Sequence, residues 1–251
     1  MKSQQNQFYT SISKYYSEIF PYNPAQWQFV KSRAGELDGK QILDIGCATG
    51  ELAFQLANEG GKVTGIDLNE DLLFQAKKNK VHPNLHFQTG NMSELINDFS
   101  PGYFDLVLCF GNTLVHLETK ELVQQMLKGV FSVLKPGGHF LLQILNYDYI
   151  LGEQLSELPL IETENIRFVR KYRFEKNSPL IRFQTTLFLK REETVISNET
   201  LLLGIKSSDL AELLPEAGFS ETELFRNFKQ EPFGRNHLPL VVGCRKGSAG
   251  L

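Results

Sequence analysis

A short glycine-containing loop is the feature of this sequence best suited to binding a ligand. The loop comprises Gly46, Cys47, Ala48, Thr49 and Gly50, and its two glycines let the backbone turn sharply and leave space for a ligand. A dinucleotide-binding fingerprint would need G-x-G-x-x-G, but here the middle glycine is replaced and the third is missing. The loop therefore predicts a nucleotide-like ligand, and a pyrophosphate is a poor fit.

Two carboxylates add a second kind of chemistry. Asp67 ends the apolar run 62–67, where a carboxylate can accept hydrogen bonds from both hydroxyl groups of a ribose. Asp44 ends the run 41–45 and adds negative potential beside the loop. The alternative is that Asp44 caps a helix and Asp67 merely ends a strand. Together with the glycines, the two acids favour a ligand with a ribose and a positive charge.

The pattern Asp44-x-Gly46-x-Ala48-x-Gly50 resembles the first motif of class I methyltransferases that depend on S-adenosylmethionine (SAM), with alanine at the usual middle glycine. Segment 90–92 resembles the part of that family that meets adenine, 110–112 the part that lines the methionine moiety, and 134–138 the turn before the fifth strand. The resemblance implies SAM as cofactor. The implied SAM-binding residues are Tyr16, Asp44, Gly46, Cys47, Ala48, Gly50, Asp67, Leu68, Asn91, Met92, Phe110 and Gly111.

Several of these residues also have structural explanations. Asn91 is typical of a turn and Met92 of an apolar core. Tyr16 is implied near the cofactor because the N-terminal helix of the family folds over SAM, and ordinary aromatic packing is the alternative.

A closer similarity concerns the acceptor side. Segments 111–117 and 146–151 resemble the corresponding stretches of glycine and sarcosine N-methyltransferases, but the arginine that holds the amino-acid carboxylate in those enzymes falls at Leu145. Glycine is therefore not the expected acceptor. Basic residues on the segment 166–203 predict a solvated sheet face, and the alternative is that one of them replaces the missing arginine. These are Arg167, Arg170, Lys171, Arg173 and Arg182.

Four residues are candidates for catalysis: Asn112, His116, Tyr147 and Asp148. Methyl transfer from a sulfonium is an in-line displacement that depends mostly on positioning, because the leaving group needs no proton. An oxygen nucleophile would call for a base such as His116 or Asp148, whereas a nitrogen nucleophile must only be bound neutral. The structural alternatives are a helix start at Asn112, a core histidine, and a turn after the fifth strand.

Composition limits the possible partners. With 41% hydrophobic residues among 251, the chain can bury the core of one domain with an insertion. A formal charge of -3 without a Lys/Arg run predicts a small-molecule acceptor and no nucleic acid partner. Without a signal-like or membrane-spanning run, we expect a cytoplasmic protein that does not bind membranes. The three cysteines lack metal-ligand spacing, so no disulfide or metal site is expected, and monomer or homodimer stays open.

The elements that position the loop alternate between strand and helix. Strands are expected at 41–45, 62–67, 85–88, 103–109 and 139–145, with helices at 51–59, 70–80 and 119–134. Such alternation predicts a parallel sheet with helices on both sides. A helix at 207–217, capped by Ser207 or Ser208 and closed by Gly218, precedes strands at 219–225 and 239–244.

The expected fold is α/β, a Rossmann-like, doubly wound, mostly parallel seven-stranded sheet with an antiparallel β lid inserted after the fifth strand. Residues 1–145 form the SAM-binding core with an N-terminal helical cover, 146–204 the lid, 205–246 the completion of the sheet and 247–251 a flexible tail. The predicted function is methyl transfer from SAM to a nitrogen or oxygen of a small molecule. A non-catalytic SAM-binding module and, less favoured, an NAD-dependent oxidoreductase are the alternatives.

Overall fold

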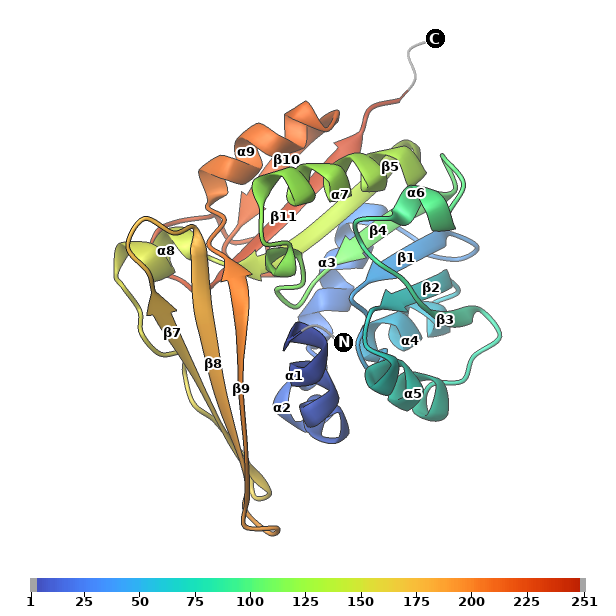
Figure 1. Ribbon diagram of the computed structural model, residues 1–251. Helices are drawn as coiled ribbons and strands as arrows, with labels where there is room; N and C mark the ends of the chain where they lie inside the picture. Colours follow the sequence, from blue (N-terminus) through green and yellow to red (C-terminus); the bar gives the residue numbers. More distant parts are fainter. Residues whose placement is uncertain (1–3, 249–251) are drawn as a thin grey trace.

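A seven-stranded sheet forms the centre of the chain in the computed structural model, which describes residues 4–248 (Figure 1). The strand order is β10-β11-β5-β4-β1-β2-β3, and only β11 runs antiparallel to both of its neighbours. The strands are β1 (Gln41–Ile45), β2 (Lys62–Asp67), β3 (Leu85–Thr89), β4 (Phe104–Cys109), β5 (Leu134–Leu145), β10 (Phe219–Phe225) and β11 (Pro239–Lys246). The predicted Rossmann-like sheet is confirmed.

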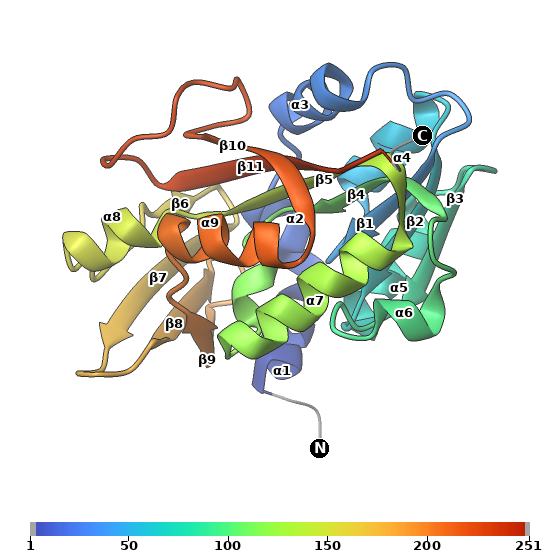
Figure 2. The same cartoon turned by 90° about the horizontal axis from the view of Figure 1, so that it is seen from above.

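Helices cover both faces of this sheet (Figure 2). On one face lie α7 (Lys120–Val133) and α9 (Ser207–Glu216), and on the other α3 (Pro24–Ala34) and α4 (Glu51–Asn58). The remaining helices are α5 (Glu70–Asn79), α6 (Leu95–Asp98), α8 (Tyr147–Gly152) and the 3-10 turn η2 (Leu114–His116).

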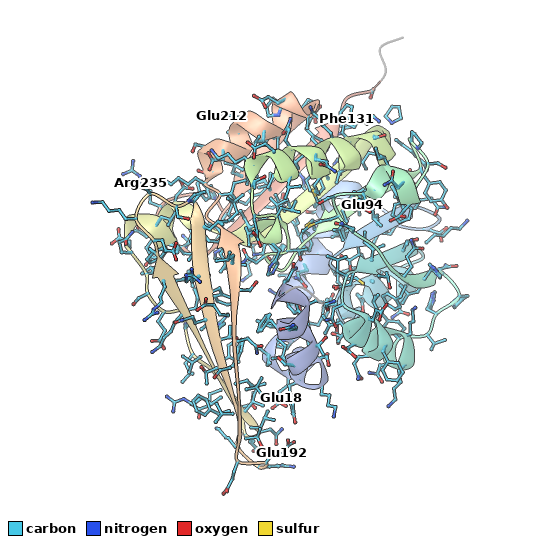
Figure 3. All side chains as sticks on the ribbon, viewed as in Figure 1. Glu18, Glu94, Phe131, Glu192, Glu212 and Arg235 are labelled. Carbon is cyan, nitrogen blue, oxygen red and sulfur yellow. The ribbon has the colours of Figure 1, made fainter. Side chains whose placement is uncertain are left out.

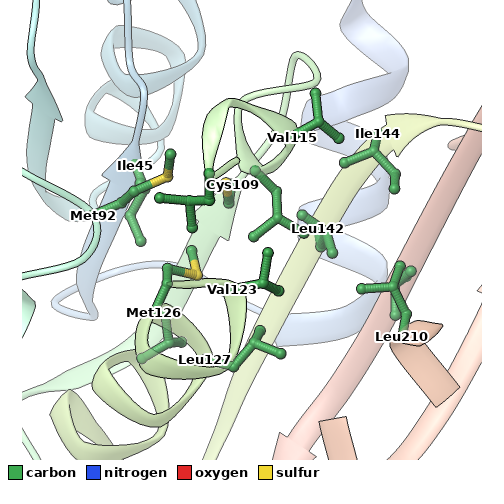
Figure 4. Packing of buried hydrophobic residues seen from close by; sticks show 14 of the residues in the cluster. Ile45, Met92, Cys109, Val115, Val123, Met126, Leu127, Leu142, Ile144 and Leu210 are labelled. Carbon is green, nitrogen blue, oxygen red and sulfur yellow. The ribbon is translucent and has the colours of Figure 1, made fainter. Parts of the chain in front are cut away.

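Alternation along β1 divides the core into two layers. Leu43 and Ile45 belong to the layer under α7, while Ile42 belongs to the layer under α3 and α4, because successive strand residues point to opposite faces. In the first layer, Met126 and Leu127 of α7 reach over the sheet towards strand residues such as Leu142 (Figure 4). Burial of such side chains stabilises the fold by about 1.5–3 kcal/mol each.

A second, four-stranded antiparallel sheet forms the lid. It contains β6 (Ile161–Glu162), β7 (Ile166–Phe174), β8 (Leu180–Leu189) and β9 (Thr194–Leu203) in that order. The inner face of β7 buries Phe168 and Tyr172, whereas Arg167 and Arg173 on the other face are exposed. This alternation confirms the antiparallel sheet that the polar and apolar pattern predicts.

Two N-terminal helices lie between the lid and the core (Figure 1). They are α1 (Gln4–Ile12) and α2 (Tyr16–Ile19), joined by the 3-10 turn η1 (Ser13–Tyr15). Phe8, Ile12 and Ile19 pack with Phe168 and other lid residues in one apolar cluster.

Polar contacts join the same helices to the far end of the lid. The hydroxyl of Tyr15 donates to Oε1 of Glu192 at 2.7 Å, and Nδ2 of Asn165 donates to Oε1 of Glu18 at 3.1 Å. Figure 3 labels Glu18 and Glu192 at this end. The lid is therefore held to the core partly through the N-terminal helices.

The structure differs from the expected elements in two places. Strand β5 begins at Leu134 rather than at residue 139, because the glycine turn pairs with β4 through an irregular register. The cap of α9 is Lys206 rather than Ser207 or Ser208, since the carboxylate of Asp209 accepts from the Lys206 N–H at 2.8 Å and both serines lie inside the helix.

The domain boundaries stay a prediction. Of the predicted tail, Gly247 and Ser248 are exposed and lie outside helices and strands, and residues 249–251 lie outside the described residues. All three cysteines are buried and unpaired. Within residues 4–248, no helix has the length and apolar character to cross a bilayer, and no cluster of three His, Cys, Asp or Glu side chains suits a metal ion.

Candidate functional site

A cavity of about 140 Å³ lies at the carboxyl ends of β1, β2 and β4, under the N-terminal helices. Ligands of open α/β sheets bind at this edge. Predicted site residues that line the cavity are Tyr16, Gly46, Ala48, Asp67, Leu68, Met92, Gly111 and His116. The other lining residues are Gln5, Asn6, Tyr9, Ile45, Ile66, Asn69, Leu72, Gly90 and Thr113.

The glycine loop needs its glycines for two reasons. Gly46 has φ +72° and Gly50 has φ +77°, a conformation that side chains disfavour. A Cβ at Gly46 would lie 2.5 Å from Oγ1 of Thr113, and one at Gly50 would overlap the Phe87 ring. The Gly46 N–H donates to the Ile66 carbonyl oxygen at 2.8 Å, which fixes the loop against β2.

Asp67 presents its carboxylate at the end of β2. Oδ2 accepts from the Ala48 N–H at 3.0 Å and Oδ1 from the Asn69 N–H at 2.8 Å. Each oxygen keeps a lone pair for a further donor, so the carboxylate can hold two ligand hydroxyl groups. Burial raises the pKa of Asp67, while these backbone hydrogen bonds act to lower it.

Asp44 lies beneath the cavity rather than on its wall. Its side chain is 4% exposed, and burial followed by the nearby Asp67 raises its pKa to about 7. Cys47 is also buried, and its pKa is raised well above the ordinary value by burial and the two carboxylates. Neither residue lines the cavity, and direct contact of either with SAM stays a prediction.

The segment after β3 contributes its apolar residue and its glycine to the cavity. Gly90 and Met92 line the wall, whereas Oδ1 of Asn91 accepts from the Ser93 N–H at 3.0 Å and Nδ2 donates to Glu94 at 3.1 Å. The amide of Asn91 thus stabilises a local turn, and its contact with adenine stays a prediction.

The segment after β4 also places only one of its two predicted SAM-binding residues at the cavity. Gly111, with φ +75°, lines the cavity. The Phe110 ring packs instead with Phe29 and Phe228 in the layer under α3.

Helix α1 supplies cavity residues that the sequence analysis missed. Gln5, Asn6 and Tyr9 all line the wall, and the Tyr9 hydroxyl lies 2.8 Å from Nε2 of His116. The signal in the sequence was the spacing of Asn6 and Tyr9, which puts them on one side of a helix. A short helix whose buried apolar side consists of Phe8 and Ile12 alone is hard to recognise, since packing stabilises it more than its own residues do.

His116 is neutral at physiological pH. Burial lowers its pKa to about 4, and Nδ1 is buried without a hydrogen-bond partner. Because Nε2 is paired with Tyr9, Nδ1 is the ring atom left for another group. His116 is thus positioned to contact a ligand in the cavity, and its catalytic role stays a prediction.

Asn112, which is partly buried, and Tyr147 form a hydrogen-bonded pair next to the cavity residues Gly111 and Thr113. Asn112, at φ +66°, accepts through Oδ1 from the Leu145 N–H at 2.9 Å, and its Nδ2 donates to the Tyr147 hydroxyl at 3.2 Å. Tyr147 is completely buried, and burial raises its pKa to about 12. Oδ2 of Asp148 instead accepts from the Ser207 N–H at 2.9 Å, in the connection to α9.

Comparison with known proteins finds similarity to methyltransferases. Residues 42–138 match the family model described as a methyltransferase domain. A protein of Geobacillus sp. (strain WCH70) with a provisional methyltransferase name is 37% identical over 145 residues, or 54% of this chain and 57% of that protein. Ubiquinone biosynthesis O-methyltransferase of Shewanella pealeana is 29% identical over 157 residues, or 59% of this chain and 65% of that one. The chain thus spans less than two thirds of the length of each of these relatives.

The likeness in fold extends over the whole chain. The crystal structure of an S-adenosylmethionine-dependent methyltransferase from Clostridium acetobutylicum superposes with a TM-score of 0.78 and 18% identity, covering 98% of this chain and 100% of that one. The resemblance to glycine and sarcosine N-methyltransferases in particular stays a prediction. Residues 42–138 thus match a methyltransferase domain, and the whole chain shares the fold of a SAM-dependent methyltransferase of known structure.

Proposed function

We propose that the whole protein transfers the methyl group of SAM to a nitrogen or oxygen of a small molecule. The observation that carries this proposal is the Asp67 carboxylate, which faces the cavity beside the glycine loop and keeps a lone pair on each oxygen for a ribose hydroxyl. The named activity of the Shewanella relative, an O-methyltransferase of ubiquinone biosynthesis, supports a small-molecule acceptor.

The residues present fit SAM. Gly46 brings the backbone of the loop to the cavity wall, and Ile66, Leu68 and Met92 offer apolar surface for a purine ring. When bound, SAM supplies a methyl group on a positively charged sulfur. The negative charges of Asp67 and, beneath it, Asp44 favour that positive charge.

The residues of this chain then act mainly by positioning. Tyr9 and Tyr16 cover the cavity from the N-terminal helices, which keeps water away from the reacting groups. His116 holds its Nδ1 free for a hydrogen bond to the acceptor. With a pKa of about 4, His116 is a weak base, so the acceptor binds best with its nucleophilic atom already unprotonated.

The cofactor assignment is tested by substituting Asp67→Ala and measuring SAM affinity by calorimetry. We expect a loss of roughly tenfold to a hundredfold, as for charge-assisted hydrogen bonds. Asp98→Ala, on the exposed helix α6, is the matched control and should bind SAM normally. Unchanged SAM affinity in Asp67→Ala contradicts the assignment.

Catalysis itself is tested by mass spectrometric detection of S-adenosylhomocysteine (SAH) with a panel of amines and phenols. Formation of SAH that depends on an added acceptor supports the proposal. SAM binding without turnover of any acceptor would instead favour a non-catalytic SAM-binding module. Thermal stabilisation by NAD and not by SAM would favour an oxidoreductase.

A further inference from the structure

Two hydroxyl groups on the inner face of the lid are buried without a hydrogen-bond partner. They belong to Tyr172 on β7 and Thr185 on β8, and each side chain is 3% exposed. The Tyr172 hydroxyl lies near that of Tyr147 but makes no well-aligned hydrogen bond with it. An unpaired buried polar group costs free energy that a hydrogen bond to a ligand would recover. The two hydroxyl groups therefore mark a ligand-binding surface.

Arg170 completes this surface. It pairs directly with Thr185 across the two strands and precedes Tyr172 by two residues, so all three residues share the inner face. Its Nε is buried without a partner, and a terminal nitrogen donates to the Pro159 carbonyl oxygen at 2.7 Å. We refer to Arg170, Tyr172 and Thr185 as the lid triad.

The charge of Arg170 is not neutralised within the part of the chain that the structure describes. No carboxylate of residues 4–248 forms an ion pair with it, whereas Arg182, on the exposed side of the sheet, pairs with Glu175 and Glu199. Burying a cation without a counter-charge is unfavourable, and burial lowers the pKa of Arg170 accordingly. A negatively charged ligand group would supply the missing charge.

The lid triad is connected to the cofactor cavity. Tyr172 lies beside Tyr147, and burial followed by this neighbour raises the pKa of Tyr172. The Tyr147 hydroxyl in turn accepts from Nδ2 of Asn112 at 3.2 Å, and Gly111 and Thr113, on either side of Asn112, line the cavity. Tyr9 and His116 line the cavity. A ligand that extends from Arg170 past Tyr172 thus points its other end towards the position of the methyl donor.

We propose that the methyl acceptor carries a carboxylate, which the lid triad binds through Nε of Arg170 and the hydroxyl groups of Tyr172 and Thr185. The inference rests on the proposed function and names the acceptor class of that site. A single arginine matches one negative charge, which favours a carboxylate over a phosphate dianion.

The test measures binding of carboxylates to the full chain saturated with SAH. The probes are acetate, benzoate, 4-aminobenzoate and 6-aminohexanoate, each compared with its amide, together with inorganic phosphate and phenylphosphonate. We expect at least one acid to bind tenfold or more tightly than its amide. Arg170→Gln should abolish this preference, Arg170→Lys should retain part of it, and Arg173→Gln, on the exposed face of the same strand, should leave it intact.

Several results would overturn the inference: no acid preferred over its amide, a preference that survives in Arg170→Gln, or tighter binding of the phosphonate than of every carboxylate. If Arg170→Gln does not fold, Tyr172→Phe provides the second variant and should weaken carboxylate binding without affecting the amide. SAH affinity is measured in the same titrations. Failure of the wild-type chain to bind SAH would count against the proposed function, whereas normal SAH binding without carboxylate preference would count against the lid triad alone.

Discussion

At the residue scale, the site depends on a few positions where backbone conformation and charge are both unusual. Gly46 and Gly50 adopt positive φ in closely packed surroundings, and Asp44 is a carboxylate buried beneath a cavity. Each of these features would be unfavourable in an ordinary core. They occur together at the strand ends where a ligand would bind, which is where strain and buried charge are commonly found.

Substitution of Gly46→Ala should reduce both stability and SAM affinity. The new Cβ would lie 2.5 Å from Oγ1 of Thr113, and the backbone of the alanine would have to keep a φ of +72°. We expect a loss of about 1–3 kcal/mol in the free energy of unfolding, measured by urea denaturation. Gly102→Ala is the matched control, because Gly102 has φ +64° with nothing within 4 Å of its Cβ position. Equal losses in the two variants would show that backbone strain, and not the contact with Thr113, is responsible.

The pH dependence of SAM affinity should report Asp44. Its pKa of about 7 means that it is largely protonated at pH 6 and largely ionised at pH 8. Affinity for the positively charged SAM should therefore rise as the pH increases from 6 to 8, as measured by calorimetry. His116, with a pKa of about 4, does not titrate in this range. Asp44→Asn should remove the pH dependence, and a slope that persists in this variant would assign it to another group.

Without a ligand, the same group should affect stability in the opposite direction. Because the folded pKa of Asp44 is raised, the folded state binds more protons than the unfolded state between pH 4 and 7. The contribution of Asp44 to the free energy of unfolding therefore decreases as the pH rises through this range and stays low above pH 7. The melting temperature of Asp44→Asn, compared with wild type at pH 5 and 8, checks the sign, and the variant should gain relative stability at pH 8.

At the element scale, the strands and helices of the core could be predicted because their patterns are local. The apolar run of β1 and the alternation of β7 follow directly from burial on one or both faces. Helix α1 could not be located in this way, since Gln5, Asn6 and Tyr9 acquire their role only by packing against distant elements. For the same reason, the sequence did not distinguish Arg170 from its four basic neighbours in the lid. Their burial depends on how the whole sheet is docked.

Asn69 links two of these elements and allows the cover to be tested. Its Oδ1 caps α5 by accepting from the Leu72 N–H, while its Nδ2 donates to Oγ1 of Thr10 at 3.0 Å on α1. Asn69→Ser keeps a capping oxygen and loses the donor to α1. We expect faster amide hydrogen exchange in residues 4–12 with little change in α5, measured by mass spectrometry. Asn79→Ser, at the exposed end of α5, is the control, and faster exchange throughout α5 would indicate loss of the cap instead.

At the scale of the whole molecule, the N-terminal helices are the part that both the lid and the cofactor cavity require. Phe8 and Ile12 pack against the lid sheet, while Asn6 and Tyr9 of the same helix line the cavity. Lid docking and cover of the cavity are therefore coupled through one helix. A substitution on the inner face of the lid should therefore weaken cofactor binding, even though no residue of the lid strands lines the cavity.

The pair Phe168→Ala and Phe188→Ala separates this coupling from a general effect of removing an aromatic ring. Phe168 is fully buried between the lid and the N-terminal helices, where its ring lies 6.0 Å from that of Phe20. Phe188 is on the opposite face of the same sheet and is 36% exposed. We expect Phe168→Ala to lower the free energy of unfolding by about 3–5 kcal/mol, and Phe188→Ala by less than about 1 kcal/mol. Of the two, only Phe168→Ala should also weaken SAH binding under conditions where both proteins are folded, because it loosens α1 over the cavity. If Phe168→Ala is destabilised but binds SAH as tightly as Phe188→Ala, the lid and the cofactor site are independent units.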